Sequence, residues 1–130
     1  MKSKLFVYGS LMKKSSHSMA AFLFDNAKAL GEAKMRGELY RISWYPGAVY
    51  NPELSTYVYG ELFEIQEETT LFKQLDKYEG VGVEFPVPNE YERIKVFVEF
   101  DNQEVESWIY NYNISLLGAG KITSGKFYNV

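Results

Sequence analysis

Two aromatic segments that each contain a glycine constrain the fold most strongly. Residues 57–65 alternate apolar and polar side chains over their second half, and Gly60 interrupts the run. The tetrapeptide 60–63, Gly-Glu-Leu-Phe, has a close counterpart at 37–40, Gly-Glu-Leu-Tyr. Such alternation is typical of a half-buried strand, and a glycine inside it indicates a bulge or a bend. The two segments therefore predict bent strands of one curved sheet.

Only two segments have clear helical spacing. Met19, Phe22 and Leu23 lie on one face of a helix that Ser15 or Ser16 would cap. The second helix spans 67–78 and carries four apolar residues on one face, after which Glu79 and Gly80 mark its end.

The remaining apolar runs predict strands. They lie at 5–8, 91–100 and 105–112, with a hairpin turn at Asp101-Asn102, a turn at 45–47 and a loop over 81–89. With only two helices, the pattern predicts an α+β fold in which a curved mixed β-sheet closes toward a barrel with flanking helices. We expect residues 1–130 to form a single compact domain.

Composition excludes several classes of partner and chemistry. The net charge is −3 with both signs interspersed, so we expect no nucleic-acid partner. The sequence has no stretch of about 20 apolar residues, which predicts no membrane span and a cytoplasmic protein. Cysteine is absent and His17 is the only histidine, so we expect no metal, although a carboxylate-only site stays open. The oligomeric state stays open as well.

The first strand ends in a turn suited to a ligand. Gly9 and Ser10 follow it, and glycine lets a ligand approach backbone N–H groups that suit a carboxylate or an oxyanion. Ser10 has no basic partner in the sequence, which favours a binding role over a nucleophilic one. The segment 75–80, Leu-Asp-Lys-Tyr-Glu-Gly, would supply a carboxyl group to the same pocket.

These motifs, taken together, resemble the gamma-glutamylcyclotransferase-like family, which includes the gamma-glutamylamine cyclotransferases. The resemblance covers nearly the whole chain, and the matching motifs lie at 8–11, 37–40, 45–47, 58–62, 75–80, 91–93 and 122–125. It implies a compact mixed β-barrel with flanking helices. It also implies an enzyme that releases 5-oxoproline from a small gamma-glutamyl compound without cofactor or metal.

The resemblance also implies roles for particular residues. Glu79 matches the family's catalytic acid/base, and the turn at Gly9, Ser10 and Leu11 matches its substrate-binding loop. Tyr8, Tyr91 and Tyr110 are candidate substrate-binding residues on strands, with filling of the barrel as the alternative for each.

The expected reaction is an intramolecular acyl transfer. The substrate's α-amino group attacks its own γ-carbonyl, so a base must accept a proton and an acid must deliver one to the leaving amine. An α-amino group with a pKa of about 8 is mostly protonated at neutral pH, and a carboxyl with a raised pKa suits both steps.

Several alternatives stay open. Asp76 is a helix-surface carboxylate or a like charge that raises the pKa of Glu79. Arg93 is a surface strand charge or a partner for a substrate carboxylate, and His17 belongs to the first helix. For the protein as a whole, two alternatives to an enzyme stay open. One is a non-catalytic small-molecule (carboxylate) binding protein, and the other is a structural or protein-interaction module.

Overall fold

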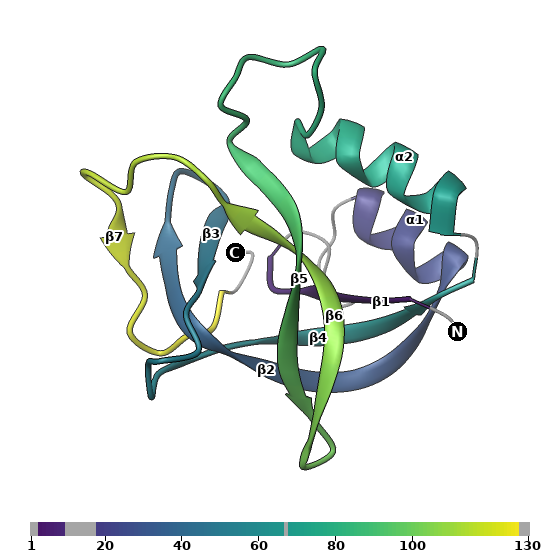
Figure 1. The fold of residues 1–130 in the computed structure, drawn as a ribbon, viewed down its shortest axis with the longest axis horizontal. Coiled ribbons are helices and arrows are strands. Elements are labelled where there is room, and N and C mark those ends of the chain that lie inside the picture. Colours follow the sequence, from purple (N-terminus) through teal and green to yellow (C-terminus); the bar gives the residue numbers. More distant parts are fainter. Residues whose placement is uncertain (1–2, 10–17, 67, 128–130) are drawn as a thin grey trace.

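A ring of five strands forms the centre of the structure, a computed structural model that describes residues 3–9, 18–66 and 68–127 (Figure 1). Around the ring, each strand pairs with the next. The last strand, β5 (Tyr91–Phe100), pairs back to the first, β2 (Ala27–Arg41), which closes the barrel. The pair of β1 (Lys4–Val7) and β6 (Gln103–Tyr112) is parallel, and the other pairs of the ring are antiparallel. The predicted α+β fold with a mixed sheet closing into a barrel is therefore confirmed. The five strands, in ring order, are β2 (Ala27–Arg41), β4 (Tyr57–Ile65), β1 (Lys4–Val7), β6 (Gln103–Tyr112) and β5 (Tyr91–Phe100).

The far end of β2 extends beyond the ring. There it pairs with β3 (Pro46–Tyr50) and with the short β7 (Gly120–Lys121). The turn predicted at 45–47 lies one to two residues earlier, because the N–H groups of Ile42 and Ser43 both donate to the Tyr45 carbonyl. Pro46 begins β3, a position where a strand tolerates a residue without an N–H.

The bulge in the β2–β4 ladder lies at Gly31 and not at Gly60. The β2–β4 register shifts between Ala29 and Gly31, where Gly31 has φ +139°, and the ladder continues through Gly60 without a shift. Gly60 has a different role. A Cβ there would lie 2.1 Å from the Val7 carbonyl oxygen, so glycine lets β4 approach β1 closely.

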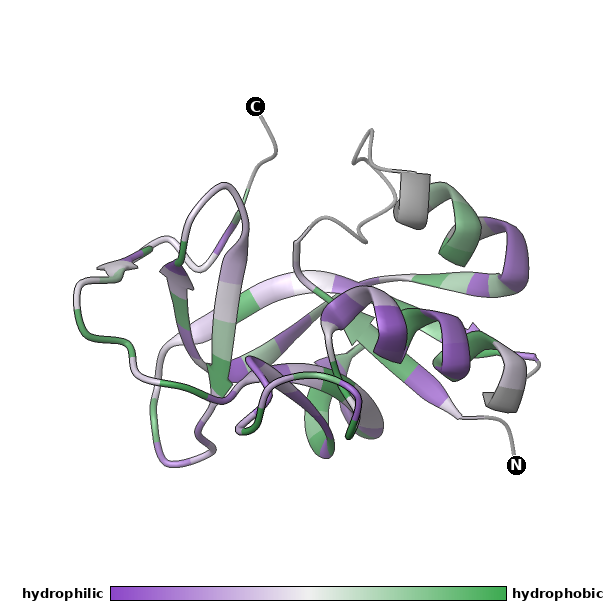
Figure 2. Ribbon diagram, turned by 90° about the horizontal axis from the view of Figure 1, so that it is seen from above, coloured by the Kyte–Doolittle hydropathy of each residue, from purple (hydrophilic) through white to green (hydrophobic). Residues whose placement is uncertain are grey.

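Two helices lie beside each other against one side of the barrel (Figure 1). They are α1 (Ser18–Asn26) and α2 (Glu68–Glu79), and both carry bands of polar and apolar residues (Figure 2). The predicted end of the second helix is confirmed, because Gly80 follows it with φ +74° as a left-handed terminator. Residues 10–17, which include the predicted cap at Ser15 or Ser16, lie outside the described part of the chain. No helix among the described residues is long and apolar enough to cross a membrane.

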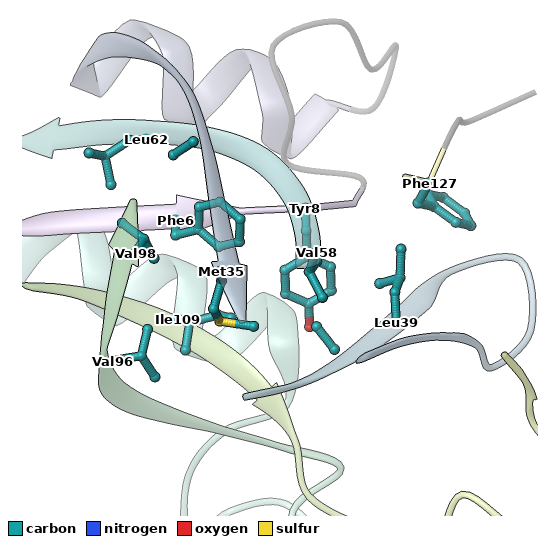
Figure 3. Close-up of a cluster of buried hydrophobic side chains, with 12 residues drawn as sticks. Phe6, Tyr8, Met35, Leu39, Val58, Leu62, Val96, Val98, Ile109 and Phe127 are labelled. Carbon is teal, nitrogen blue, oxygen red and sulfur yellow. The ribbon is translucent and has the colours of Figure 1, made fainter. Parts of the chain in front are cut away.

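Side-chain alternation along the strands separates two apolar clusters. In β1, Leu5 and Val7 face the helices, whereas Phe6 faces the barrel interior (Figure 3). Neighbouring residues of β6 separate in the same way, with Ile109 inside and Tyr110 toward the helices. The predicted hairpin turn is also confirmed, since Asp101 and Asn102 have the positive φ values of a tight hairpin. The barrel therefore fixes the ends of β1, β5, β6 and α2 relative to one another.

Candidate functional site

A cavity of about 200 Å³ opens where the end of β1 meets the end of α2. Its wall also includes the turn before β3 and the first residue of β5. Five of the seven residues predicted for the site lie in this wall: Tyr8, Gly9, Glu79, Tyr91 and Tyr110. The other two, Ser10 and Leu11, lie outside the described residues, as does His17. The tertiary structure thus brings together residues from four separate segments.

Glu79 lies at the last position of α2, where it contributes its carboxyl group to the cavity. The side chain keeps partial exposure, as expected for a group in a cavity wall. Burial, followed by the negative charges of Glu90 and Asp76, raises the pKa of Glu79 to about 8. A carboxyl with this pKa exchanges protons near neutral pH, which an ordinary surface glutamate does not do.

Three buried tyrosines form the polar part of the wall. The Tyr8 hydroxyl donates to the Tyr110 carbonyl at 2.5 Å, and the Tyr91 hydroxyl donates to the Pro46 carbonyl at 2.5 Å. The Tyr110 hydroxyl donates to Asp76 Oδ1 at 2.6 Å. Burial raises the pKa of each of these tyrosines above its usual value, so all three stay neutral donors.

Gly9 lies close to the turn before β3. A Cβ at this position would lie 2.7 Å from Cγ of Pro46, so a larger residue would push the two segments apart. This close approach gives a physical reason for glycine at the start of the predicted ligand-binding turn. That the turn binds an anion stays a prediction.

Asp76 and Arg93 form an ion pair that connects α2 to the barrel. Arg93 Nε and a terminal guanidinium nitrogen donate to the two Asp76 oxygens at 2.8 and 3.1 Å. The guanidinium also lies over the rings of Phe72 and Trp108, at 4.1 and 4.6 Å from their centroids. Arg93 is thus occupied by Asp76, and it is not among the residues that line the cavity. This pair decides two alternatives that the sequence left open. Asp76 is paired and is not a plain helix-surface carboxylate, and Arg93 binds Asp76 instead of a substrate carboxylate.

The sequence analysis missed a second carboxyl group in the wall. Glu90 lies directly before β5, and its Oε2 accepts a hydrogen bond from the Tyr45 hydroxyl at 2.5 Å. The sequence offers one weak signal for it, because Glu90 precedes a predicted strand whose first residue was already a site candidate. Its partner is 45 residues away, and no local pattern connects the two.

The described residues include no cluster of three or more acidic or histidine side chains that could hold a metal ion. Of the two carboxyl groups in the cavity wall, Glu90 accepts a hydrogen bond from Tyr45, and its negative charge acts on Glu79. A carboxyl with the raised pKa of Glu79 suits proton transfer.

Comparisons with known proteins found similar sequences and folds. The family model described as gamma-glutamyl cyclotransferase, AIG2-like, matches residues 5–129. YkqA of Bacillus subtilis strain 168, which is named provisionally as a gamma-glutamylcyclotransferase, is 33% identical over 128 residues. The match covers 96% of this chain and 41% of YkqA, so the chain spans less than half of this curated relative.

Solved structures show the same fold. The crystal structure of YkqA superposes with a TM-score of 0.71 and 30% identity, over 98% of this chain and 40% of YkqA. The solution structure of YtfP from Escherichia coli gives a TM-score of 0.62 at 28% identity, over 95% of both chains. An AIG2-like protein from Mus musculus gives 0.73 at 19% identity, over 98% of this chain and 88% of the mouse chain, and at that identity supports the fold alone.

Proposed function

The chain belongs to the gamma-glutamyl cyclotransferase, AIG2-like family, and from this premise we propose that it releases 5-oxoproline from a gamma-glutamyl amine, amide or amino-acid derivative. Glu79 is the proposed general acid and base. The observation that carries the proposal is a carboxyl in the cavity wall whose pKa is raised to about 8 by burial and by two neighbouring carboxylates.

The proposed reaction forms one carbon–nitrogen bond and breaks another. The α-amino nitrogen of the substrate attacks its own γ-carbonyl carbon, which closes a five-membered ring. Glu79 accepts a proton from this nitrogen and delivers one to the leaving nitrogen, so the products are 5-oxoproline and a free amine. The attacking and accepting atoms belong to one molecule, and a cavity that holds it folded contributes through orientation.

The proposed anchor for the substrate's negative charge is the backbone around Gly9. The described cavity wall contains no lysine, arginine or histidine, and the hydroxyls of Tyr8, Tyr45, Tyr91 and Tyr110 donate to acceptors within the protein, so the proposed donors to the substrate are backbone N–H groups. Such dipoles are effective where water is excluded, for a carboxylate or for the developing oxyanion. Tyr8 adjoins this backbone and its hydroxyl is held by Tyr110.

The test uses Glu79→Gln, which keeps the size of the side chain and removes its proton chemistry. We expect loss of about 10²- to 10⁴-fold in 5-oxoproline release from the best donor in a panel of gamma-glutamyl amines, amides and dipeptides. Glu92→Gln is the matched control, because Glu92 is exposed on β5 and is not among the cavity residues. Circular dichroism and a thermal melt establish that both variants fold. Undiminished activity in Glu79→Gln contradicts the proposed mechanism.

The same panel separates an enzyme from a binding protein. A binding protein is stabilised thermally by gamma-glutamyl or carboxylate ligands in proportion to their occupancy. Such stabilisation without 5-oxoproline from any donor would replace the proposed enzyme with a non-catalytic binding protein that keeps the family cavity.

A further inference from the structure

The second carboxyl group of the cavity, Glu90, has no part in the reaction proposed above. It lies before β5, whereas Glu79 ends α2, and both carboxyl groups contribute to the wall of the same cavity. Two carboxyl groups in one small cavity interact through their charges, and the proton affinity of one depends on the charge of the other.

The position of the Glu90 carboxylate is fixed by Tyr45. The Tyr45 hydroxyl donates to Glu90 Oε2 at 2.5 Å. The Tyr45 ring is itself held between aromatic neighbours, with Trp44 at 5.1 Å and Tyr91 at 6.4 Å between ring centroids. Burial and the Glu90 carboxylate raise the pKa of Tyr45 above its usual value, so the phenol stays a neutral donor. The hydrogen bond therefore orients Glu90 without cancelling its negative charge.

The groups around Glu79 differ in how their charges are compensated. From its own helix it faces Asp76, whose charge is balanced by the two-point ion pair with Arg93. From the segment before β5 the charge of Glu90 acts on it, and the hydrogen-bond partner of Glu90 is the neutral phenol of Tyr45. The other described titratable groups in the cavity wall are tyrosines, and Tyr8, Tyr45, Tyr91 and Tyr110 stay neutral; Tyr78 also lines the wall. Among the described residues, Glu90 is thus the carboxylate acting on Glu79 whose charge no ion pair balances.

We propose that Glu90, oriented by the Tyr45 hydroxyl, is a positioning residue that raises the proton affinity of the Glu79 carboxyl toward that of the substrate's α-amino group. The consequence for catalysis rests on the proposed function. A free α-amino group has a pKa of about 8, so a carboxyl of similar proton affinity exchanges a proton with it at little cost in free energy. Glu90 would then match the acid/base group to the nucleophile.

The direct test measures the protonation of Glu79 without any substrate. The full chain, labelled with ¹³C at the glutamate side-chain carboxyl carbons, is titrated by NMR, and the Glu79 signal is the one missing from Glu79→Gln. We expect a wild-type midpoint near 8. In Glu90→Gln the midpoint should fall by about one pH unit, because the like charge is gone. The Gln oxygen still accepts from Tyr45, so the fold of this variant should be preserved.

Two further variants sharpen the titration. Glu92→Gln removes an exposed glutamate of β5 and should leave the Glu79 midpoint unchanged. Tyr45→Phe frees the Glu90 side chain to leave its fixed position, and the midpoint should move in the same direction as in Glu90→Gln. An unchanged midpoint in Glu90→Gln overturns the proposal, and an unchanged midpoint in Tyr45→Phe overturns the role of Tyr45.

Activity measurements distinguish this inference from the proposed function. If the chain is a cyclotransferase, the acidic limb of the kcat/KM pH profile, which reports the free enzyme, should shift in Glu90→Gln in the same direction as the NMR midpoint. An active enzyme whose midpoint and profile do not move overturns the role of Glu90 and leaves the function intact. A midpoint that moves, in a protein that yields no 5-oxoproline from any donor, supports the charge coupling and overturns the function.

Discussion

The barrel interior and the cavity wall use the same strands and differ in the chemistry of the side chains they bury. Ile109 points into an interior with Met35 and Leu62, and each of these side chains is fully buried (Figure 3). The next residue, Tyr110, belongs to the other face and extends a hydroxyl to Asp76. Along β6, strand alternation therefore places a residue of the apolar core and a residue of the polar site on opposite faces of the sheet.

This difference separates two kinds of free energy. The interior gains stability from apolar burial, which is roughly proportional to the area removed from water. The cavity wall buries a carboxyl group and tyrosine hydroxyls, which is unfavourable unless each is hydrogen-bonded or neutral. The two regions share Phe6 and Tyr8, and the other interior side chains lie away from the cavity wall. Substitutions on the two faces should therefore affect different measurements.

The largest effect on stability is expected in the interior. Leu62→Ala should lower the free energy of unfolding by about 2–5 kcal/mol, because it removes a fully buried side chain and leaves a cavity. Urea denaturation measures the change. Leu117→Ala is the control, since Leu117 is 96% exposed and should change stability by less than about 0.5 kcal/mol. Equal losses of stability from both substitutions would contradict the difference in burial between Leu62 and Leu117.

A pH dependence of stability is expected from the cavity wall. The pKa of Glu79 is raised in the folded protein to about 8 from the ordinary glutamate value of 4.5, so the folded state holds this proton more tightly than the unfolded state does. The stabilising contribution is present in full below pH 4.5 and is lost as the pH rises toward 8, by roughly 1–4 kcal/mol in total. Glu79→Gln should not show this loss.

The comparison is made by urea denaturation at several pH values. Glu79→Gln should become more stable than the wild type as the pH rises from 5 to 8, and Glu92→Gln should follow the wild type. A constant difference between Glu79→Gln and wild type across that range would mean that Glu79 does not titrate within it.

A third prediction concerns the contact between two strands of the ring. Gly60→Ala places a Cβ 2.1 Å from the Val7 carbonyl oxygen, so β4 and β1 must move apart. We expect a loss of about 1–3 kcal/mol in the free energy of unfolding. Gly120→Ala is matched to it, because a Cβ at Gly120 would contact nothing within 4 Å. Equal melting temperatures for the two variants would contradict the close strand approach.

The smallest effect is expected for a single hydroxyl of the cavity wall. Tyr91→Phe removes the donor to the Pro46 carbonyl and should cost about 1 kcal/mol. Tyr59→Phe, on the exposed side of β4, is the reference for loss of a phenol without loss of that bond. Greater destabilisation by Tyr59→Phe than by Tyr91→Phe would show that the wall hydroxyls do not contribute to folding.

Local patterns were sufficient for the elements of secondary structure and several site candidates. The second helix and the hairpin at 101–102 match their predictions closely, because helical spacing, a terminating glycine and turn residues act over a few positions. The sequence predicted a bulge or a bend at Gly60, whereas the register shift lies at Gly31, because the register depends on the partner strand and not on a local pattern. Family motifs identified Glu79 and the tyrosines that line the cavity.

The sequence by itself determined which segments alternate, where the second helix ends and which side chains carry ionisable groups. The tertiary structure alone decided the neighbours of those groups. Tyr45 meets Glu90, and Arg93 meets Asp76 instead of solvent or substrate, through contacts that span 45 and 17 residues. The physical reason is that periodicity and turn chemistry are local, whereas the charge and burial that set a carboxyl's pKa depend on barrel closure, which brings distant segments together.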